Sequence, residues 1–432
     1  MFQNIRHFFR NTESKVLVSN FLSLSVLQGL NILLPLLTIP FIIKTAGLDS
    51  FGLISYAAAL ALFFIVFVEY GFNTITTRDI SLHSDNKEET ERIYSEVLTS
   101  KLFLLLISSV VFSILIVSIN SFRENYDIYF LSFLGIIGYA IFPIWLFHGL
   151  QKMKYITYIN VFFKSVFTIC IFIFLKDKTN IWVVPLCTSL GFISSGIASV
   201  ILVRRKFNIR FRIASFVSVK KQLRNAYHIF ISEMYISLIA YSNILILGFF
   251  ASDAVVGIYA SAEKVIRAVG NMISPVVNSL YPYVSKVMQE DFYKGIRFVK
   301  QTVKWGRWTI LGIITLLFVS ADFLFQLMNR FMDMSTSDLE SCILAFRIMI
   351  FFPLFSFLDQ VYGKLVLIAN RKERFFFRVF SICATANVLM CAILSYKFGY
   401  IGTAVSSMAT QLFVMLGMYY YAKPLLKKNV SI

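Results

Sequence analysis

Charged residues are scarce in this chain. Asp, Glu, Lys and Arg make up 15% of its 432 residues, and 58% of the residues are hydrophobic. Soluble proteins carry about 25% charged residues. The length alone would fit two or three soluble domains, but this composition excludes them and is typical of a polytopic membrane protein.

Motifs for catalysis are missing as well. The sequence has no Walker A loop, no glycine-rich dinucleotide turn, no H-E-x-x-H and no G-x-S-x-G. Its five cysteines lie in apolar runs without metal-ligand spacing, which excludes a disulfide-stapled secreted domain and indicates small apolar filler. We therefore expect no cofactor, no metal and no catalytic residue, and a transporter rather than an enzyme.

Long apolar runs are what the chain does have. They lack the alternation of a barrel strand, so helices are the expected spanning elements. Twelve candidate spans follow one another, at residues 19–43, 51–72, 98–119, 128–148, 156–175, 181–203, 229–250, 257–285, 305–328, 339–366, 377–396 and 400–422. The predicted class is an all-α polytopic membrane protein with about 12 transmembrane helices.

The basic residues indicate the orientation in the membrane. The formal net charge is +18, which in a soluble protein would favour nucleic-acid binding. With the N-terminus inside, however, the inner segments hold 29 of the 41 Lys and Arg residues and the outer connections hold 6. Cytoplasmic loops of membrane proteins carry such an excess. We therefore expect both termini in the cytoplasm and no nucleic-acid partner.

Residues 204–228 divide the chain near its middle. They contain eight cations and predict a cytoplasmic linker held at the anionic inner leaflet. The predicted domains are an N-terminal six-helix bundle at 1–203 and a C-terminal six-helix bundle at 229–432. A second long inner connection, 73–97, mixes both signs of charge and predicts a solvated amphipathic helix.

A short internal repeat agrees with this division. Residues 51–58, FGLISYAA, open the second span, and residues 256–263, VGIYASAE, open the eighth. Each follows a short outer turn with an aspartate, Asp49 or Asp253. A shift of six spans keeps the orientation, so the pattern predicts a parallel repeat about an axis along the membrane normal.

Ionisable residues inside the spans are the candidate functional groups, because an unpaired charge there costs at least about 2.5–3.5 kcal/mol. They are Lys164, Lys264, Arg267, Arg347, Lys364, Glu69, Glu233, Glu263, Asp322 and Asp359. Glu69, Glu233 and Asp322 lie near span ends, where snorkelling or capping is an alternative. Glu263 and Arg267 are four residues apart, so a structural ion pair is an alternative for them.

The cations outnumber the acids once the pairs are cancelled. Arginine and lysine bind phosphate well, so we expect a central cavity that binds an anionic substrate. The expected substrate-binding residues are Lys164, Lys264, Arg267, Arg347 and Lys364. The expected sites for a coupling proton or sodium ion are Glu69, Glu263 and Asp359.

Prolines mark the expected hinges. Pro35 and Pro40 lie in the first span, shortly after the polar Gln28 and Asn31, and Pro275 lies in the eighth. Proline removes a helical hydrogen bond and bends the helix. Such helices suit a transporter that opens alternately to either side.

Residues 35–81 carry a resemblance to a known family. Their sequence, PLLTIPFIIKTAGLDSFGLISYAAALALFFIVFVEYGFNTITTRDIS, resembles the N-terminal region of bacterial polysaccharide-biosynthesis exporters, the O-antigen flippases. In that family a proline-containing helix leads through an "lGxxxFGl" turn, here residues 46–53. The second helix ends in a "D/E-Y-G-F-N" element, here residues 69–73, followed by residues 77–80, TRDI.

The resemblance implies both a fold and an activity. The fold would be that of the multidrug/oligosaccharidyl-lipid/polysaccharide exporter superfamily, two six-helix bundles forming a V. The activity would be transfer of an undecaprenyl-diphosphate-linked oligosaccharide from the inner to the outer leaflet of the bacterial inner membrane. We expect this transfer to work by alternating access and to be driven by an ion gradient or by the membrane potential. Expected partners are this lipid-linked oligosaccharide, membrane lipid, a polysaccharide polymerase and a chain-length regulator. Functional cavity charges vary in position within the family, so none is carried over.

Two other functions compete with this interpretation. A multidrug exporter of the same superfamily would favour cationic drugs and present an acidic cavity, which the buried cations argue against. A membrane polymerase or ligase needs catalytic groups on a sizeable outer loop, whereas the outer connections here are short. A non-transporting scaffold is the remaining alternative.

The predicted orientation can be tested by cysteine labelling in a cysteine-free background. Cysteines placed at Lys178 and Arg330 should react with an impermeant thiol reagent from outside, because these positions lie in outer connections. Cysteines at Lys221 and Arg374 should not react. Labelling at Lys221 in intact cells would contradict the twelve-span topology.

Overall fold

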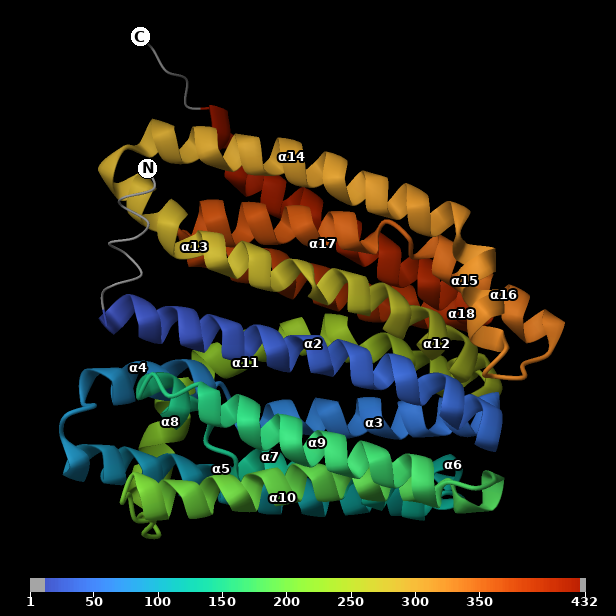
Figure 1. Cartoon of the computed structure of the whole chain (residues 1–432), viewed down its shortest axis with the longest axis horizontal. Helices are drawn as coiled ribbons and strands as arrows, with labels where there is room; N and C mark the ends of the chain where they lie inside the picture. The colour runs from blue at the N-terminus through green and yellow to red at the C-terminus, as the bar shows by residue number, and fades with distance from the viewer. Residues whose placement is uncertain (1–11, 428–432) are drawn as a thin grey trace. The chain divides into compact units, whose positions relative to one another are not determined.

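The structure is a computed structural model that describes residues 12–427, with side chains from residue 25 onward. Helices make up nearly all of this range, which contains no strand. The first half forms α2 (Thr12–Ala46), α3 (Leu48–Glu69), α4 (Phe72–Leu82), α5 (Lys87–Ser118), α6 (Asn120–Arg123), α7 (Tyr126–Ile141), α8 (Ile144–Gly149), α9 (Lys154–Phe174), the 3-10 turn η1 (Lys178–Asn180) and α10 (Val183–Lys206) (Figure 1).

The second half is helical in the same way. It forms α11 (Phe216–Phe250), α12 (Asp253–Asn271), α13 (Ile273–Glu290), α14 (Phe292–Val319), α15 (Ala321–Asn329), α16 (Thr336–Ile348), α17 (Phe352–Gln360), the π-helix η2 (Val361–Ile368) and α18 (Glu373–Lys427). The predicted all-α polytopic class is therefore confirmed.

Within the described residues, ten helical stretches are long and apolar enough to cross a membrane. The predicted number was about 12, and two elements account for the difference. First, α18 has 55 residues and breaks at Gly399, whose φ of 55° is left-handed, so it holds the last two predicted spans. Second, the eighth predicted span falls on α12, which carries several charges, and on α13, which is rich in polar residues, so neither helix is apolar enough to count.

Several predicted spans are interrupted helices. The fourth is split into α7 and α8 at Phe142 and Pro143, and the tenth into α16, α17 and η2. Proline cannot donate a backbone hydrogen bond, which explains the break at Pro143. Interrupted helices occur at membrane depth where protein surrounds them. Sequence alone recovered the runs but not these breaks.

The predicted solvated helix at 73–97 takes a different form. The chain makes a separate helix, α4, whose Phe72, Thr76 and Ile80 are buried on one face. From Lys87 the residues belong to α5, which buries Ser95 and Glu96. The continuously exposed stretch is limited to residues 81–88, at the turn between α4 and α5. The mixed charges therefore belong partly to a packed surface.

Contacts divide the chain into two compact units. The N-terminal unit comprises the chain up to Leu34 together with Leu60–Met234, and the C-terminal unit comprises Pro35–Ala59 together with the chain from Tyr235 onward. Three helices, α2, α3 and α11, therefore contribute to both units. The predicted domain boundaries at 203/204 and 228/229 stay a prediction.

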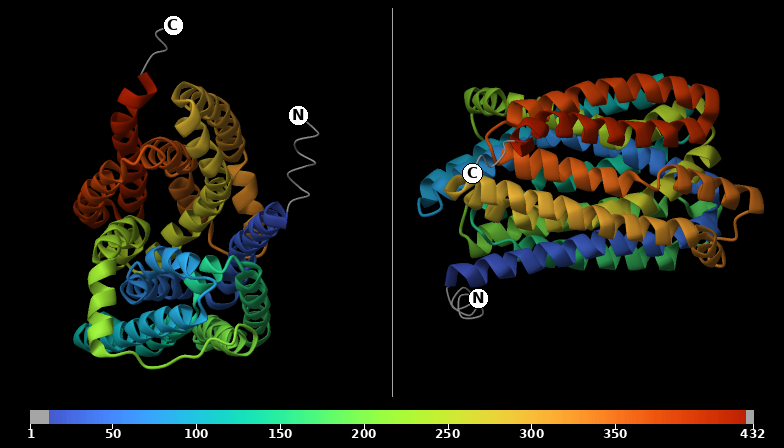
Figure 2. Two further views of the ribbon diagram at one scale, coloured as in Figure 1. Left: turned by 90° about the vertical axis from the view of Figure 1, so that its left-hand side faces the viewer. Right: turned by 90° about the horizontal axis from the view of Figure 1, so that it is seen from above.

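In the N-terminal unit, α10 packs along α7 and α9. Residues 207–215, within the predicted basic linker, turn at Asn208 and then run as an extended stretch to α11, crossing beside the first turns of α5 (Figure 2). Buried aromatic residues such as Tyr94, Trp145 and Phe147 form the core beneath this crossing. The linker is therefore attached to the N-terminal unit.

In the C-terminal unit, the starts of α3 and α12 pack against each other through glycines. A Cβ atom at Gly52 would lie 1.8 Å from the carbonyl oxygen of Asp253, and one at Gly257 would lie 2.4 Å from the carbonyl oxygen of Leu48. Each glycine is the fifth residue of its helix. The two segments of the predicted repeat thus contact one another in a reciprocal way. Small residues permit such close helix contacts in membranes.

Replacing Gly52 by alanine should destabilise the protein. The new methyl group meets a backbone oxygen that cannot rotate away, so the two helices must separate, at a cost of about 1–3 kcal/mol or more. The matched control is Gly312→Ala on α14, where no atom lies within 4 Å. The apparent melting temperature in detergent should fall for Gly52→Ala and hold for Gly312→Ala. Equal melting of Gly52→Ala and wild type would refute the contact.

Candidate functional site

A polar cavity of about 340 Å³ lies within the C-terminal unit. Residues of α11, α12, α13, α17, η2 and α18 line it. Its charged lining residues are Arg267, Asp359 and Lys364, and the other lining residues are apolar or neutral. The structure therefore brings together two of the predicted substrate cations and one predicted coupling acid. We refer to this space as the C-terminal cavity.

Arg267 is held in place at the cavity by partners on two helices. Its Nε donates to Glu263 Oε1 at 2.9 Å, one turn earlier on α12, and Nη2 donates to the Ala240 carbonyl oxygen of α11 at 3.0 Å. The buried Glu263 also accepts a hydrogen bond from the Tyr259 hydroxyl. The ion pair that the four-residue spacing allowed is thus present. It fixes the guanidinium group and neutralises part of its charge.

Asp359 and Lys364 face the cavity from consecutive helical segments. Asp359 is buried and accepts a hydrogen bond from the Gln411 side-chain amide of α18. Lys364 Nζ donates to Asn278 Oδ1 at 2.9 Å and to Gln360 Oε1 at 3.4 Å. The two residues are five apart, and the π-helical turn of η2 has the period that keeps such residues on one side. π-helical turns are frequent at functional sites.

A buried hydrogen-bond network supports one wall of the cavity. Asn387, with no exposed surface, donates to Ser242 Oγ at 3.1 Å and Asn243 Oδ1 at 3.0 Å, and it accepts from Thr410 Oγ1 at 2.7 Å. Asn243 and Thr410 both line the cavity. Asn387 therefore ties α11 to α18 behind the polar wall. It escaped the sequence analysis because an uncharged amide in an apolar run gives little signal.

Lys264 and Arg347 do not line the C-terminal cavity. Lys264 Nζ donates to Ser55 Oγ at 3.2 Å and lies 4.4 Å from the centre of the Phe51 ring, so it is directed toward the start of α3. Arg347, at the end of α16, forms a 2.6 Å ion pair with Asp322 of α15. Their predicted contacts with substrate stay predictions.

Lys164 lies in the N-terminal unit, on α9. Its Nζ donates to Asn31 Oδ1 of α2 at 2.9 Å and lies 5.2 Å from the centre of the Phe192 ring. The helix of Lys164 contains no acid, so a lysine at this depth needs a partner on another helix or a hydrated space. The partner is the amide of Asn31, one turn before Pro35. The predicted role of Lys164 in substrate binding stays a prediction.

Glu69 forms a buried ion pair in the N-terminal unit. Lys101 Nζ donates to Glu69 Oε1 at 2.8 Å and to the Tyr139 carbonyl oxygen at 3.0 Å, and Lys101 has no exposed surface. Lys101 was not singled out as a candidate. The pairing could have been inferred from membrane depth, because Glu69 and Lys101 both lie at the inner ends of consecutive predicted spans. Glu69 Oε2 is buried without a hydrogen-bond partner in the described part of the chain.

The residues after Glu69 explain the "D/E-Y-G-F-N" element. Tyr70 and Gly71 both have left-handed backbones, with φ of 47° and 75°, and they turn the chain from α3 into α4. The Tyr70 ring stacks on Phe230 of α11 at 4.2 Å. A Cβ atom at Gly71 would come within 2.8 Å of Ile229 Cγ2. The element therefore packs the end of α3 against α11.

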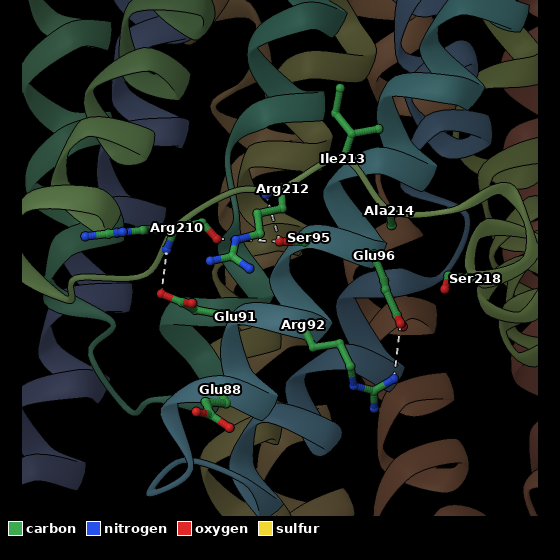
Figure 3. A pocket seen from close by; sticks show the side chains of 10 residues that line it. All are labelled: Glu88, Glu91, Arg92, Ser95, Glu96, Arg210, Arg212, Ile213, Ala214 and Ser218. Atoms are coloured by element: carbon green, nitrogen blue, oxygen red, sulfur yellow. Dashed lines mark hydrogen bonds and ion pairs between the residues drawn. The ribbon is translucent and has the colours of Figure 1, made fainter.

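A second pocket, of about 460 Å³, lies between α5 and the extended linker (Figure 3). Backbone N–H groups of Arg210, Arg212 and Ala214 donate to Glu91, Ser95 and Thr99 at 2.9–3.1 Å. Alternate residues of an extended chain advance about 6.6 Å and every fourth residue of a helix about 6 Å, so the two periods match. Charges of both signs line this pocket, which makes it an attachment surface for the linker.

The prolines predicted as hinges lie near a change of unit or a helix break. Pro35 and Pro40 are inside α2, which continues through them, and the chain passes from the N-terminal to the C-terminal unit between Leu34 and Pro35. Pro275 lies in the first turn of α13, just after the break at Met272. Whether these prolines act as hinges stays a prediction.

Among residues 25–427, whose side chains the structure describes, no group of three or more His, Cys, Asp or Glu side chains could hold a metal ion. The five cysteines are free thiols. The candidate site is therefore the polar and charged lining of the C-terminal cavity.

Known sequences similar to this chain come from polysaccharide biosynthesis. The family described as polysaccharide biosynthesis protein matches residues 17–288. A protein of Escherichia coli (strain K12) named "Putative O-antigen transporter" is 27% identical over 418 residues, 96% of this chain and 98% of that protein. A Shigella dysenteriae protein of the same name is 25% identical over 405 residues, 92% of this chain and 98% of that protein.

Solved structures of exporters share the fold. The lipid II flippase MurJ in an inward closed conformation gives a TM-score of 0.71 at 14% identity, covering 92% of this chain and 87% of that one. An inward-facing multidrug resistance MATE transporter of the MOP superfamily gives 0.69 at 14% identity, covering 91% and 99%. At this identity the likeness shows the fold alone, and it confirms the predicted exporter fold.

The ion pair of Glu69 and Lys101 predicts an asymmetry between single and double variants. Lys101→Met leaves a buried carboxylate without its partner, which should cost about 3–5 kcal/mol. Adding Glu69→Gln removes that charge and should restore most of the loss. Apparent melting temperatures and membrane abundance measure both. If the double variant is as unstable as Lys101→Met, the pairing is not what stabilises this site.

Proposed function

Since this chain belongs to the polysaccharide biosynthesis protein family, we propose that it is a flippase for a lipid-linked oligosaccharide. The substrate is an oligosaccharide on undecaprenyl diphosphate, moved from the cytoplasmic to the outer leaflet of the bacterial inner membrane. The matched region covers more than half of the chain, and the O-antigen transporter relatives align along nearly all of it. The sugar carried is left unspecified by these relatives.

The observation that carries the proposal is the pair of cations in the C-terminal cavity. Arg267 and Lys364 face one polar space inside a bundle of apolar helices. A diphosphate carries about two negative charges and needs charge-assisted contacts wherever it leaves water, each contributing about 1.5–3 kcal/mol. The polyprenyl tail stays in the bilayer, because only the polar head requires such a path. An amphiphilic anionic substrate therefore matches the cavity.

Asp359 is the proposed site for a coupling proton or cation. Of the three acids predicted for this role, Glu69 and Glu263 are each bound to a cation, whereas the contact recorded for Asp359 is with the neutral amide of Gln411. Neutralising Asp359 would leave the two cations to dominate the cavity and strengthen binding of an anion. Binding of the ion at Asp359 would therefore favour binding of the anionic substrate, because both bind in the C-terminal cavity. The dependence of transport in vesicles on proton and sodium gradients checks this link.

Helix interruptions give the proposed route for alternating access. The break at Met272 with Pro275 lies next to cavity residues of α12 and α13, and Pro35 lies where α2 changes unit. Small rotations at such points move whole helical segments without breaking further hydrogen bonds. A multidrug-type exporter is less well supported, because its likeness is one of fold at 14% identity and the cavity offers two cations.

A flippase of this kind works in a particular membrane and alongside other proteins. The chain would act in the inner membrane, with a polysaccharide polymerase and a chain-length regulator using the oligosaccharide that it delivers. No chemical step is required of the chain itself, since its relatives are transporters. A protein that only moves its substrate needs binding groups and helices that can bend. The cations of the cavity and the proline-marked helix breaks are the proposed candidates for these two needs.

Alanine at Lys364 or at Arg267 should weaken substrate handling by roughly tenfold or more, because each removes a charge-assisted contact with the diphosphate. Arg267→Lys should be only partly tolerated, since lysine cannot make bidentate contacts. Surface polysaccharide in a strain lacking its own flippase, compared at equal membrane abundance, measures the effect.

Two controls separate binding from stability. The double change Glu263→Gln with Arg267→Gln removes the cation without leaving an unpaired acid. Lys286→Ala with Glu290→Gln removes a paired cation of the same unit that does not line the cavity and should leave polysaccharide levels unchanged. Wild-type polysaccharide levels in both the Glu263/Arg267 double variant and Lys364→Ala would rule out recognition of the diphosphate by this cavity.

A further inference from the structure

The first half of α14 carries a stripe of cations. Five basic residues occur between Phe292 and Trp308, no acidic residue interrupts them, and all five are exposed: Lys294, Arg297, Lys300, Lys304 and Arg307. Their spacings of three and four residues place them on one side of the helix. We refer to these five residues as the basic stripe.

The opposite side of α14 packs into the C-terminal unit. Ile296 and Val299 are buried there. A Cβ atom at Gly295 would lie 2.4 Å from Met288 Cγ, and one at Gly306 would lie 2.1 Å from the Phe357 ring. The helix is thus fixed by its apolar, glycine-containing side against α13 and α17. Its unit leaves the basic stripe uncovered.

Tryptophans follow the basic stripe along the same exposed surface. Trp305 is 69% exposed and Trp308 61% exposed, and the Arg307 guanidinium lies 5.5 Å from the Trp308 ring. Beyond them the large exposed side chains of α14 are apolar, with Leu316 and Val319 the most exposed. Tryptophan is enriched where the headgroup region meets the hydrocarbon. The order of cation, indole and aliphatic chain therefore follows the order of layers in one leaflet.

The length of the helix agrees with this placement. From Trp308, α14 runs to Val319, and α15 follows the turn at Ser320 and ends at Asn329. The two segments together hold about 20 residues, the number that a membrane span requires. Arg307, Lys304 and Lys300 then lie within the first two turns outside it, at the depth of lipid phosphates. Lys294 and Arg297 extend further into water.

The fold does not demand a basic stripe. α5 is the helix of the first half that corresponds to α14 under the predicted repeat, and both begin at a side-chain cap, Asn86 and Asp291. Yet the first half of α5 mixes acids with bases, including Glu88, Glu89 and Arg92. The basic stripe is therefore specific to α14, and an anionic ligand at this surface would explain it.

We infer that Lys300, Lys304 and Arg307, together with Trp305 and Trp308, bind the headgroups of anionic phospholipids in the cytoplasmic leaflet. The ligand is bulk phospholipid rather than the transported substrate, because the stripe is open and periodic and encloses no sugar. Each basic residue near an anionic leaflet raises lipid association about fivefold. This surface would hold α14 at a fixed depth, and it does not depend on the proposed function.

Quenching of tryptophan fluorescence by brominated lipids tests the inference on the full chain. Trp182→Phe removes the other exposed indole, and the buried Trp145 gives a constant background. In phosphatidylcholine vesicles, brominated phosphatidylglycerol should quench Trp305 and Trp308 more strongly than brominated phosphatidylcholine. Lys300→Gln, Lys304→Gln and Arg307→Gln together should abolish this preference, a loss on the order of a hundredfold. High salt should reduce it in the unchanged chain.

A matched variant removes three exposed cations elsewhere in the same unit, Lys286→Gln, Arg374→Gln and Arg378→Gln. It should keep the preference. If the stripe triple variant does not fold, Lys304→Gln alone should lower the preference about fivefold. An unchanged preference in the stripe variants, or an equal loss in the matched variant, overturns the inference. Relief of quenching by undecaprenyl diphosphate but not by unlabelled phosphatidylglycerol also overturns it, in favour of a substrate site.

Discussion

The pairing of buried charges within their own unit is the constraint on which the structure depends. A charge that leaves water without a partner costs several kcal/mol, so each one fixes the helix that carries it. Glu69 binds Lys101 across three helices, and Glu263 binds Arg267 along one. These contacts set helix depth and rotation in a bundle whose other surfaces are aliphatic and aromatic. The C-terminal cavity exists where such pairing is incomplete.

At that cavity, structure and proposed function meet. Asp359 has an amide for a partner and Lys364 has two, so neither charge is matched by an opposite one at hydrogen-bond distance. At such a site a bound cation can pair with Asp359 and a bound anion can pair with Lys364, and either contact would stabilise the complex. The Asn387 network behind it keeps the wall rigid, so the energy of binding is not spent on ordering the helices.

Much of the architecture could be predicted from the sequence. Apolar runs gave the helices and the all-α membrane class, and the four-residue spacing gave the pair of Glu263 and Arg267. The contact between Lys101 and Glu69 joins residues 32 apart, and that between Lys164 and Asn31 joins residues 133 apart. Such contacts depend on how helices rotate and pack, which a single sequence does not encode in any local pattern. The same holds for the cavity, which depends on six helices at once.

Helix breaks were the other unpredicted feature. Hydropathy registers a run such as 339–366 as one span, although the chain forms α16, α17 and the π-helix η2 there. The break separates Arg347 from Asp359 and Lys364, which sequence analysis had placed on one helix. Local hydrogen-bond rearrangements of this kind leave the hydropathy unchanged. They nevertheless decide which charged residues share a cavity.

The central claim is that this chain transfers a lipid-linked oligosaccharide across a bilayer. The most direct measurement reconstitutes the purified chain into vesicles that carry undecaprenyl-diphosphate-linked oligosaccharide and follows the access of an impermeant lectin to the sugar on one leaflet. The account predicts that the protein makes the protected fraction accessible over time, and that Arg267 and Lys364 variants slow this transfer. Transfer no faster than in protein-free vesicles, with the correctly folded protein present, would contradict it.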